Sequence, residues 1–172
     1  MFLVRKISRA KWDSRNNIAR GLSEGEIAAD AVTGDLRTRG NAVSFWQCSD
    51  FGNAGIEDTA LAIAAAGDRL DKLDIVWISE RDLTGDGHVL ENTEGRTPVR
   101  DFIDRHVDVC SLDYVRLGKL AVHVHLAIQK KQCRRLAKSQ IKTLLGSAIS
   151  NGRISLQDLH EGIRNEIHDT AQ

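Results

Sequence analysis

The sequence is poor in proline, aromatic residues and cysteine, with one Pro, 5% aromatic residues and three Cys among 172 residues. It has no apolar run long enough to cross a bilayer, and the residues after Met1 lack the apolar core and cleavage site of a signal peptide. Cys48, Cys110 and Cys133 are odd in number and form no CxxC pair, which favours reduced thiols. We therefore expect a cytoplasmic protein without a membrane segment.

The rest of the composition, 41% hydrophobic and 28% charged residues, is typical of a globular protein. Its length predicts a single domain, 1–172, with a mixed α/β part over 1–111 and a helical part over 112–172. The first part contains three apolar segments expected to form strands and one helical pattern: Phe2–Ile7, Asn41–Cys48 and Asp74–Glu80, with a helix over Ile56–Leu73. The predicted fold class is α/β or α+β, a small mixed sheet with a central helix and a C-terminal helical hairpin. The second and third strands with their helix form a βαβ unit if they pair in parallel.

The second part begins with an ambiguous segment. Residues 112–128 alternate like a strand but have helical flanks, and we favour a helix. A basic amphipathic helix is predicted over 129–147, and a final acidic helix over 155–168.

The net charge of zero hides a segment without carboxylates. Between Tyr114 and Gln157 there are nine Lys and Arg residues and neither Asp nor Glu. Six of these cations share one broad face of the predicted basic helix: Lys130, Lys131, Arg134, Arg135, Lys138 and Lys142. Such a face predicts a docking surface for an acidic protein partner.

Two alternatives remain for this basic face. One is nucleic acid, although no aromatic residue follows Tyr114 to stack on bases. The other is neutralisation within the chain by the acidic residues of the final helix, which are Asp158, Glu161, Glu166 and Asp169. The sequence does not decide between them, nor does it predict whether the chain forms a homo-oligomer.

No catalytic or nucleotide-binding motif stands out, since HExxH, GxSxG, GxGxxG and GxxxxGK[ST] are all absent. The leading hypothesis is therefore a non-catalytic interaction module without a cofactor, a small subunit of a larger assembly that docks through the basic hairpin.

One arrangement supports an enzyme as the alternative. An early strand carries Arg5, and the next strand carries Ser44 before a helix and a third strand. This order is loosely similar to that of the ADP-ribosyltransferases. The resemblance implies NAD as the cofactor, held by Arg5 with Ser44 near the nicotinamide ribose. It also implies Glu91 or Glu94 as the carboxylate that stabilises an oxocarbenium ion.

A metal site has weak support. Asp82, Thr84 and Asp86 resemble the first half of a calcium loop, but position 12 is Thr93 rather than Glu. A tight hairpin turn over 84–87 explains the same residues more simply. His123 and His125 would share one side only on a strand.

Overall fold

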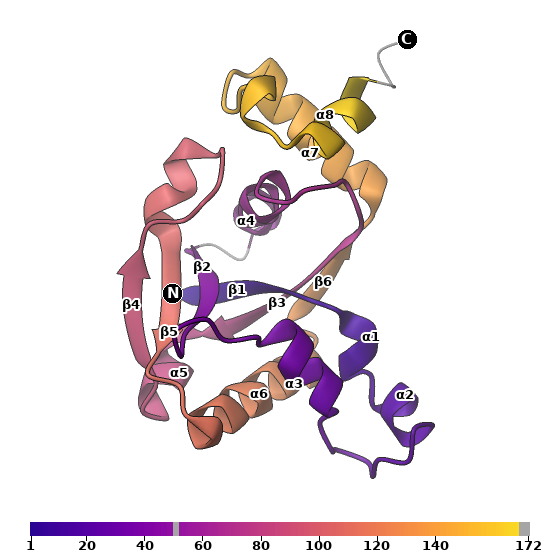
Figure 1. Cartoon of the computed structure of the whole chain (residues 1–172), viewed down its shortest axis with the longest axis vertical. Coiled ribbons are helices and arrows are strands. Elements are labelled where there is room, and N and C mark those ends of the chain that lie inside the picture. Colours follow the sequence, from indigo (N-terminus) through magenta and orange to yellow (C-terminus); the bar gives the residue numbers. More distant parts are fainter. Residues whose placement is uncertain (50–51, 169–172) are drawn as a thin grey trace.

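A computed structural model describes residues 1–49 and 52–168 (Figure 1). Its centre is a six-stranded sheet with the strand order β4-β5-β2-β1-β3-β6, in which every neighbouring pair is antiparallel. The strands are β1 (Phe2–Ile7), β2 (Val43–Cys48), β3 (Leu73–Ser79), β4 (Val89–Thr93), β5 (His106–Cys110) and β6 (Cys133–Leu136).

Helices connect and cover these strands. The α-helices are α1 (Arg9–Trp12), α2 (Ser14–Ile18), α3 (Ala29–Asp35), α4 (Asn53–Ala65), α5 (Glu80–Gly85), α6 (Tyr114–Gln129), α7 (Lys138–Ser150) and α8 (Glu161–His168). Two 3-10 helices, η1 (Arg100–Arg105) and η2 (Leu156–Asp158), precede β5 and α8. Within the described ranges no helix is long and apolar enough to cross a membrane.

The sheet is covered on both faces. On one face α4, α7 and α8 pack over residues such as Val4 and Ile75, and on the other α3 and α6 pack over residues such as Leu3 and Phe45. In Figure 1 the first group lies above the central strands and the second below them. Consecutive residues Leu3 and Val4 are both fully buried because they face opposite cores, which suits β1 to a central position.

The predicted mixed α/β class is confirmed, and the strands at the three apolar segments form β1, β2 and β3. β2 and β3 run in the same direction, since each pairs antiparallel with β1. They do not pair with each other, however, because β1 lies between them. The βαβ unit is therefore a split one, with β1 inserted between its two strands.

The predicted basic helix over 129–147 is wrong for its first half and present in its second half, over 138–147, as part of α7. The preferred helix over 112–128 is present as α6, which ends at Gln129. Lys131 then takes a left-handed backbone conformation, with φ of 60°. The chain continues as β6, in which Leu136 lies opposite Leu73, and α7 begins only at Lys138. The helical part thus also supplies an edge strand of the sheet, because Leu136 is buried there against the α4 and α7 core.

Two further expectations differ from the structure. Residues 84–87 form no hairpin turn, because α5 occupies Glu80–Gly85 and β4 pairs with β5 rather than with β3. The final helix is interrupted, with η2 and α8 separated at Leu159 and His160. Leu159 is buried in the core of α4 and α7, and this contact fixes the break.

Candidate functional site

Four of the six cations predicted to form a docking face have partners within the chain. Arg134 donates to Glu57 of α4 at 3.0 Å, and Arg135 binds both oxygens of Asp74 at 2.7 and 2.9 Å. Two lysines of α7 bind Glu166 of α8: Lys138 through the carboxylate and Lys142 through the backbone carbonyl. These cations join β6 and α7 to the rest of the fold.

The final helix contributes less of this neutralisation than expected. Of its four acidic residues Glu166 makes such contacts, and Asp169 lies outside the described residues. Most of the other partners come from distant segments, such as α4 and β3. The hydrogen bond from Lys138 holds the pKa of Glu166 below its ordinary value.

Arg153 binds two acidic residues from different elements. Its guanidinium binds Asp58 of α4 and both oxygens of Asp101 in η1, and it lies over the ring of Phe102 at 5.7 Å. The hydrogen bond from Arg153 lowers the pKa of Asp101 below its ordinary value. The loop after α7 is thereby fixed to two other elements.

Of the other four cations of the segment without carboxylates, Arg116 pairs with Asp113 at 3.9 Å, which leaves three. Across residues 1–49 and 52–168, the side chains of Lys119, Lys130 and Lys131 form neither an ion pair nor a hydrogen bond. Lys119 lies on α6, and the other two follow its last residue directly. The uncompensated positive charge of the segment is therefore gathered along one helix.

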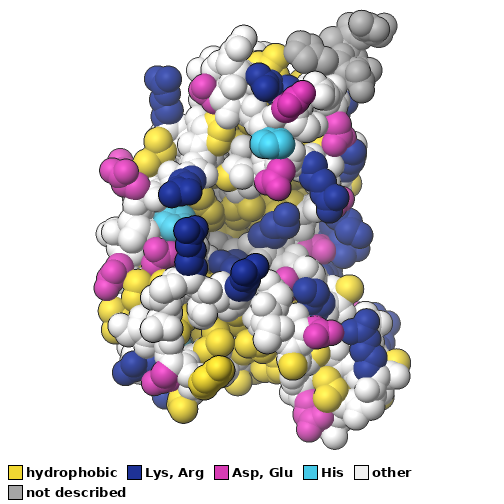
Figure 2. Space-filling model, viewed as in Figure 1, with side chains coloured by type: hydrophobic (Ala, Val, Ile, Leu, Met, Phe, Trp, Pro, Cys, Tyr) yellow, Lys and Arg dark blue, Asp and Glu magenta, His cyan; other side chains and the backbone are white. Residues whose placement is uncertain are grey.

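The same helix exposes apolar side chains. Val115, Val122 and Leu126 are 70%, 47% and 41% exposed, and at 100° per residue they lie on one face with Gly118 and Lys119. We call these five residues the α6 outer face. A Cβ at Gly118 would meet no atom within 4 Å, so a partner backbone has room to approach there. Figure 2 shows hydrophobic side chains gathered along the lower edge of the molecule, where Figure 1 places α6.

The opposite side of α6 is buried against the sheet. Leu120 and Val124 are fully buried, as part of the core that includes Val76 and Ile78 of β3. The outer face is therefore exposed although the inner side of α6 is well packed against the sheet. Tyr114, at the first turn, is 93% exposed and adds an aromatic ring beside this face.

One edge of α6 carries a small histidine cluster. His123 Nε2 lies 2.7 Å from Asp86 Oδ2, and the rings of His123 and His88 are 6.0 Å apart. His88 is buried, and neither of its ring nitrogens has a hydrogen-bond partner among the residues that the structure describes. Burial lowers the pKa of His88, and the nearby His123, Lys119 and Arg116 lower it further, against the opposing charge of Asp86.

Arg5 and Ser44 of the enzyme alternative lie next to each other, but Arg5 is already engaged. Its guanidinium donates to the carbonyls of Asp35, at 2.6 Å, and Ser44. Burial lowers the pKa of Arg5 to about 10, against the opposing charges of Asp35 and Asp108. The arginine fills the gap where β1 and β2 diverge, since their pairing stops at Val4.

Ser44 belongs to a polar network on the sheet. Its hydroxyl donates to Asp108 at 2.7 Å, and the other oxygen of Asp108 accepts from Thr93 at 3.1 Å. Glu91 is exposed and lies opposite Asp108, so it is two strands from Ser44. Glu94, the other candidate carboxylate, is exposed just after β4.

The weak calcium site has no supporting geometry in the described residues. Asp82 and Thr84 lie on α5, and Asp86, which follows it, is held by His123. No group of three or more His, Cys, Asp or Glu residues within these ranges could hold a metal ion. His123 and His125 diverge on α6, where His125 lies 2.9 Å from the side-chain nitrogen of Gln129.

The α6 outer face was not predicted from the sequence, because the apolar residues of 112–128 were not divided between the inner and the outer side of the helix. On a helix, Leu120, Val124 and Ile128 share the inner side, whereas Val122 and Leu126 do not. Apolar residues that lie off the buried stripe were the signal that could have identified it.

Comparisons of the chain with family models, with curated proteins and with solved structures found no match.

Proposed function

We propose that this protein is a non-catalytic interaction module, a small subunit of a larger assembly, which docks an acidic partner protein through the α6 outer face. The observation that carries the proposal is a coincidence on one helix. The lysines without a partner in the described chain and the exposed apolar side chains both lie along α6.

The apolar residues supply the main reason to expect a protein partner. Val115, Val122 and Leu126 lie in line on an otherwise well-packed helix, and apolar side chains gathered on a surface mark interaction sites. A partner helix would bury them by packing along α6, and Gly118 between them allows close approach of its backbone. The expected partner segment is thus an amphipathic helix.

Charge selects the partner among such helices. The outer face carries Lys119, with Lys130 and Lys131 at its C-terminal end, and α6 itself has no carboxylate. Asp or Glu residues beside the apolar face of a partner helix would meet these lysines at the rim. A second copy of this chain would bring the same cations together, so we expect a different protein.

Nucleic acid is the weaker candidate for this face. Its phosphates would satisfy the three lysines, but they would leave the three exposed aliphatic side chains in water. Cys48, Cys110 and Cys133 form no disulfide in the part of the chain that the structure describes, which supports a reducing compartment, and we propose the cytoplasm for the assembly.

Site-specific photo-crosslinking in the producing cell tests the proposal. A photoreactive residue at Val122 is compared with one at Ile18, which is 49% exposed on α2 and serves as the control. We expect Val122 to give a product whose crosslinked peptide is an acidic amphipathic segment of another protein. Crosslinks to a second copy or to nucleic acid, the same products from Ile18, or no product would contradict it.

A further inference from the structure

A second region, none of whose lining residues lies on α6, surrounds the C-terminal end of β1. Three adjoining cavities meet there, and Lys6 lines all of them. The two larger ones measure about 330 and about 370 Å³, within the range of small-molecule sites. Figure 2 shows Lys and Arg side chains around a hollow in the middle of the molecule, with hydrophobic side chains along its upper part.

The cavity of about 370 Å³ is cationic. Five basic side chains line it against two acidic ones: Lys6, Arg9, Arg69, Lys72 and Arg135 against Asp71 and Asp74. Arg135 is fixed by Asp74, and Arg69 lies 4.0 Å from Asp71. Among the described residues no ion-pair partner exists for the side chains of Lys6, Arg9 and Lys72, all three of which are exposed.

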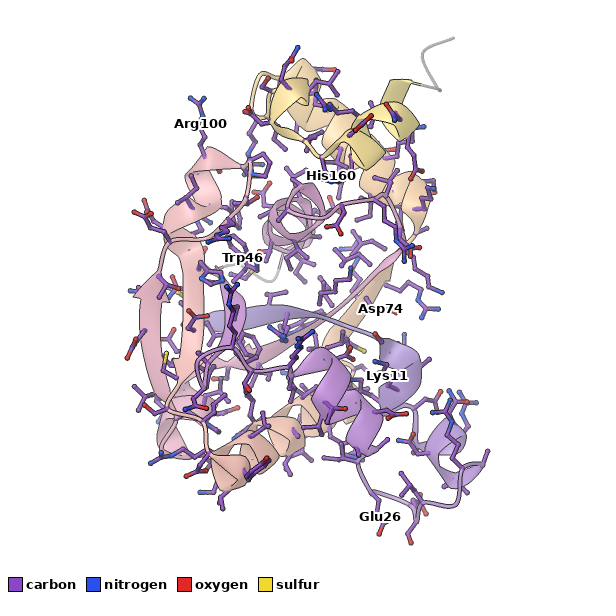
Figure 3. The ribbon with its side chains drawn as sticks, viewed as in Figure 1. Lys11, Glu26, Trp46, Asp74, Arg100 and His160 are labelled. Carbon is purple, nitrogen blue, oxygen red and sulfur yellow. The ribbon has the colours of Figure 1, made fainter. Side chains whose placement is uncertain are left out.

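The cavity of about 330 Å³ has a different lining. Trp46 of β2, Ile63 of α4 and Ile7 give it apolar walls. The rest of the lining is polar, with the hydroxyls of Ser8 and Ser44 and the charged residues Arg5, Lys6 and Asp35. The ring of Trp46 is held edge-on by His106 at 5.0 Å, and Gly95 packs so closely against the ring that a Cβ there would clash with it. An aromatic wall is therefore already in position. Figure 3 labels Trp46, which lines the cavity of about 330 Å³, and Asp74, which lines the cavity of about 370 Å³.

We propose that these cavities bind a nucleoside diphosphate, with the phosphates among Lys6, Arg9 and Lys72 and the base against Trp46 and Ile63. Lysine and arginine are the residues that hold phosphate, by point charge and by forked hydrogen bonds. The cations gather at one end and the apolar walls at the other, which matches one ring joined to a short charged tail. A long polyanion would need cations along its whole track.

This inference is independent of the α6 outer face, none of whose residues lines these cavities. It also gives Arg5 no direct role, because that guanidinium is already bound to backbone carbonyls.

Titration calorimetry of the full chain with ADP tests it, with Lys6→Ala and Lys72→Ala as variants and Lys119→Ala as the control. All three lysines are exposed, so we expect unchanged thermal unfolding. ADP should bind the parent protein. Lys6→Ala and Lys72→Ala should each weaken ADP binding about tenfold, and Lys119→Ala should leave it unchanged.

Parallel titrations separate the two halves of the ligand. Pyrophosphate should bind more weakly than ADP, and adenosine should bind more weakly still. The proposal is overturned if ADP does not bind at millimolar concentration, if Lys119→Ala weakens binding as much as Lys6→Ala, or if pyrophosphate binds as tightly as ADP. It is also overturned if an oligothymidine strand binds and ADP does not.

Discussion

The two halves of the segment without carboxylates differ in how their cations are used. From β6 to the loop after α7, Arg134, Arg135, Lys138 and Arg153 all bind acidic side chains of other elements. Along α6 and directly after it, Lys119, Lys130 and Lys131 bind none in the part of the chain that the structure describes. A run of positive charge in a sequence therefore combines structural and available cations, and only the fold separates them.

The difference follows from position in the fold. β6 is an edge strand and α7 packs on α4, so the basic residues of β6 face acids of α4 and β3, and those of α7 face α8. The outer side of α6 faces away from the sheet, and within residues 1–49 and 52–168 no acidic side chain pairs with Lys119, Lys130 or Lys131. Availability for a partner is thus set by which layer lies next to each cation.

The largest predicted effect concerns the cations between β6 and the loop after α7, which bind acidic side chains of other elements. Arg153→Ala should lower the free energy of unfolding by about 2 kcal/mol, because it removes charged hydrogen bonds to Asp58 and Asp101. Urea denaturation measures this. Arg116→Ala is the matched control, since its ion pair with Asp113 is exposed and 3.9 Å long, and it should change stability by less than about 0.5 kcal/mol. Equal losses of unfolding free energy in the two variants would show that the cations of the two halves do not differ in their contribution to stability.

The next prediction concerns the pH dependence of stability that arises from His88, which lies beside α6. Burial and the nearby cations lower the pKa of His88 in the folded state, so the unfolded chain binds the proton more tightly. Stability should therefore fall as the pH drops from about 7 to about 5, through the ordinary histidine range. His106, whose pKa burial also lowers, contributes in the same direction.

Unfolding measured across that pH range checks this contribution. His88→Leu should flatten the decline, because it removes the buried group that must be protonated. His160→Gln, at an exposed position, should leave the decline unchanged. An unaltered slope in His88→Leu would contradict the assignment.

The smallest predicted effect concerns the lysines that lie on α6 or directly after it. Lys130→Gln together with Lys131→Gln should change the free energy of unfolding by less than about 0.5 kcal/mol, since neither side chain has a partner in the described chain. Thermal unfolding at low salt measures it. A clear loss of stability would place these lysines among the structural cations.

Local patterns predicted much of the fold. The apolar runs at β1, β2 and β3 were identified, and the flanks of α6 favoured a helix over a strand. β5 was missed although Val107 and Val109 alternate with polar residues, because the segment is only five residues long. β6 was missed because its cations were assigned to a helix face, whereas Arg135 pairs with Asp74, 61 positions earlier. Such long-range pairing leaves no periodic signal in a single sequence.

The candidate site was predicted less well for the same reason. The segment without carboxylates was recognised, but the cations chosen from it were mostly those that the fold neutralises. Which cations remain available depends on acids elsewhere in the chain, such as Glu57 and Glu166. The exposed Val122 and Leu126 became apparent only when α6 was oriented against the sheet.

The most direct test of the α6 outer face is the affinity of the purified protein for a synthetic peptide of the acidic segment crosslinked from Val122. Val122→Asp is compared with Ile18→Asp, an equivalent change at an exposed apolar residue on α2. The account predicts that Val122→Asp weakens binding at least about tenfold, with unchanged unfolding, and that Ile18→Asp leaves it as in the parent. Equal affinities for all three proteins would contradict it.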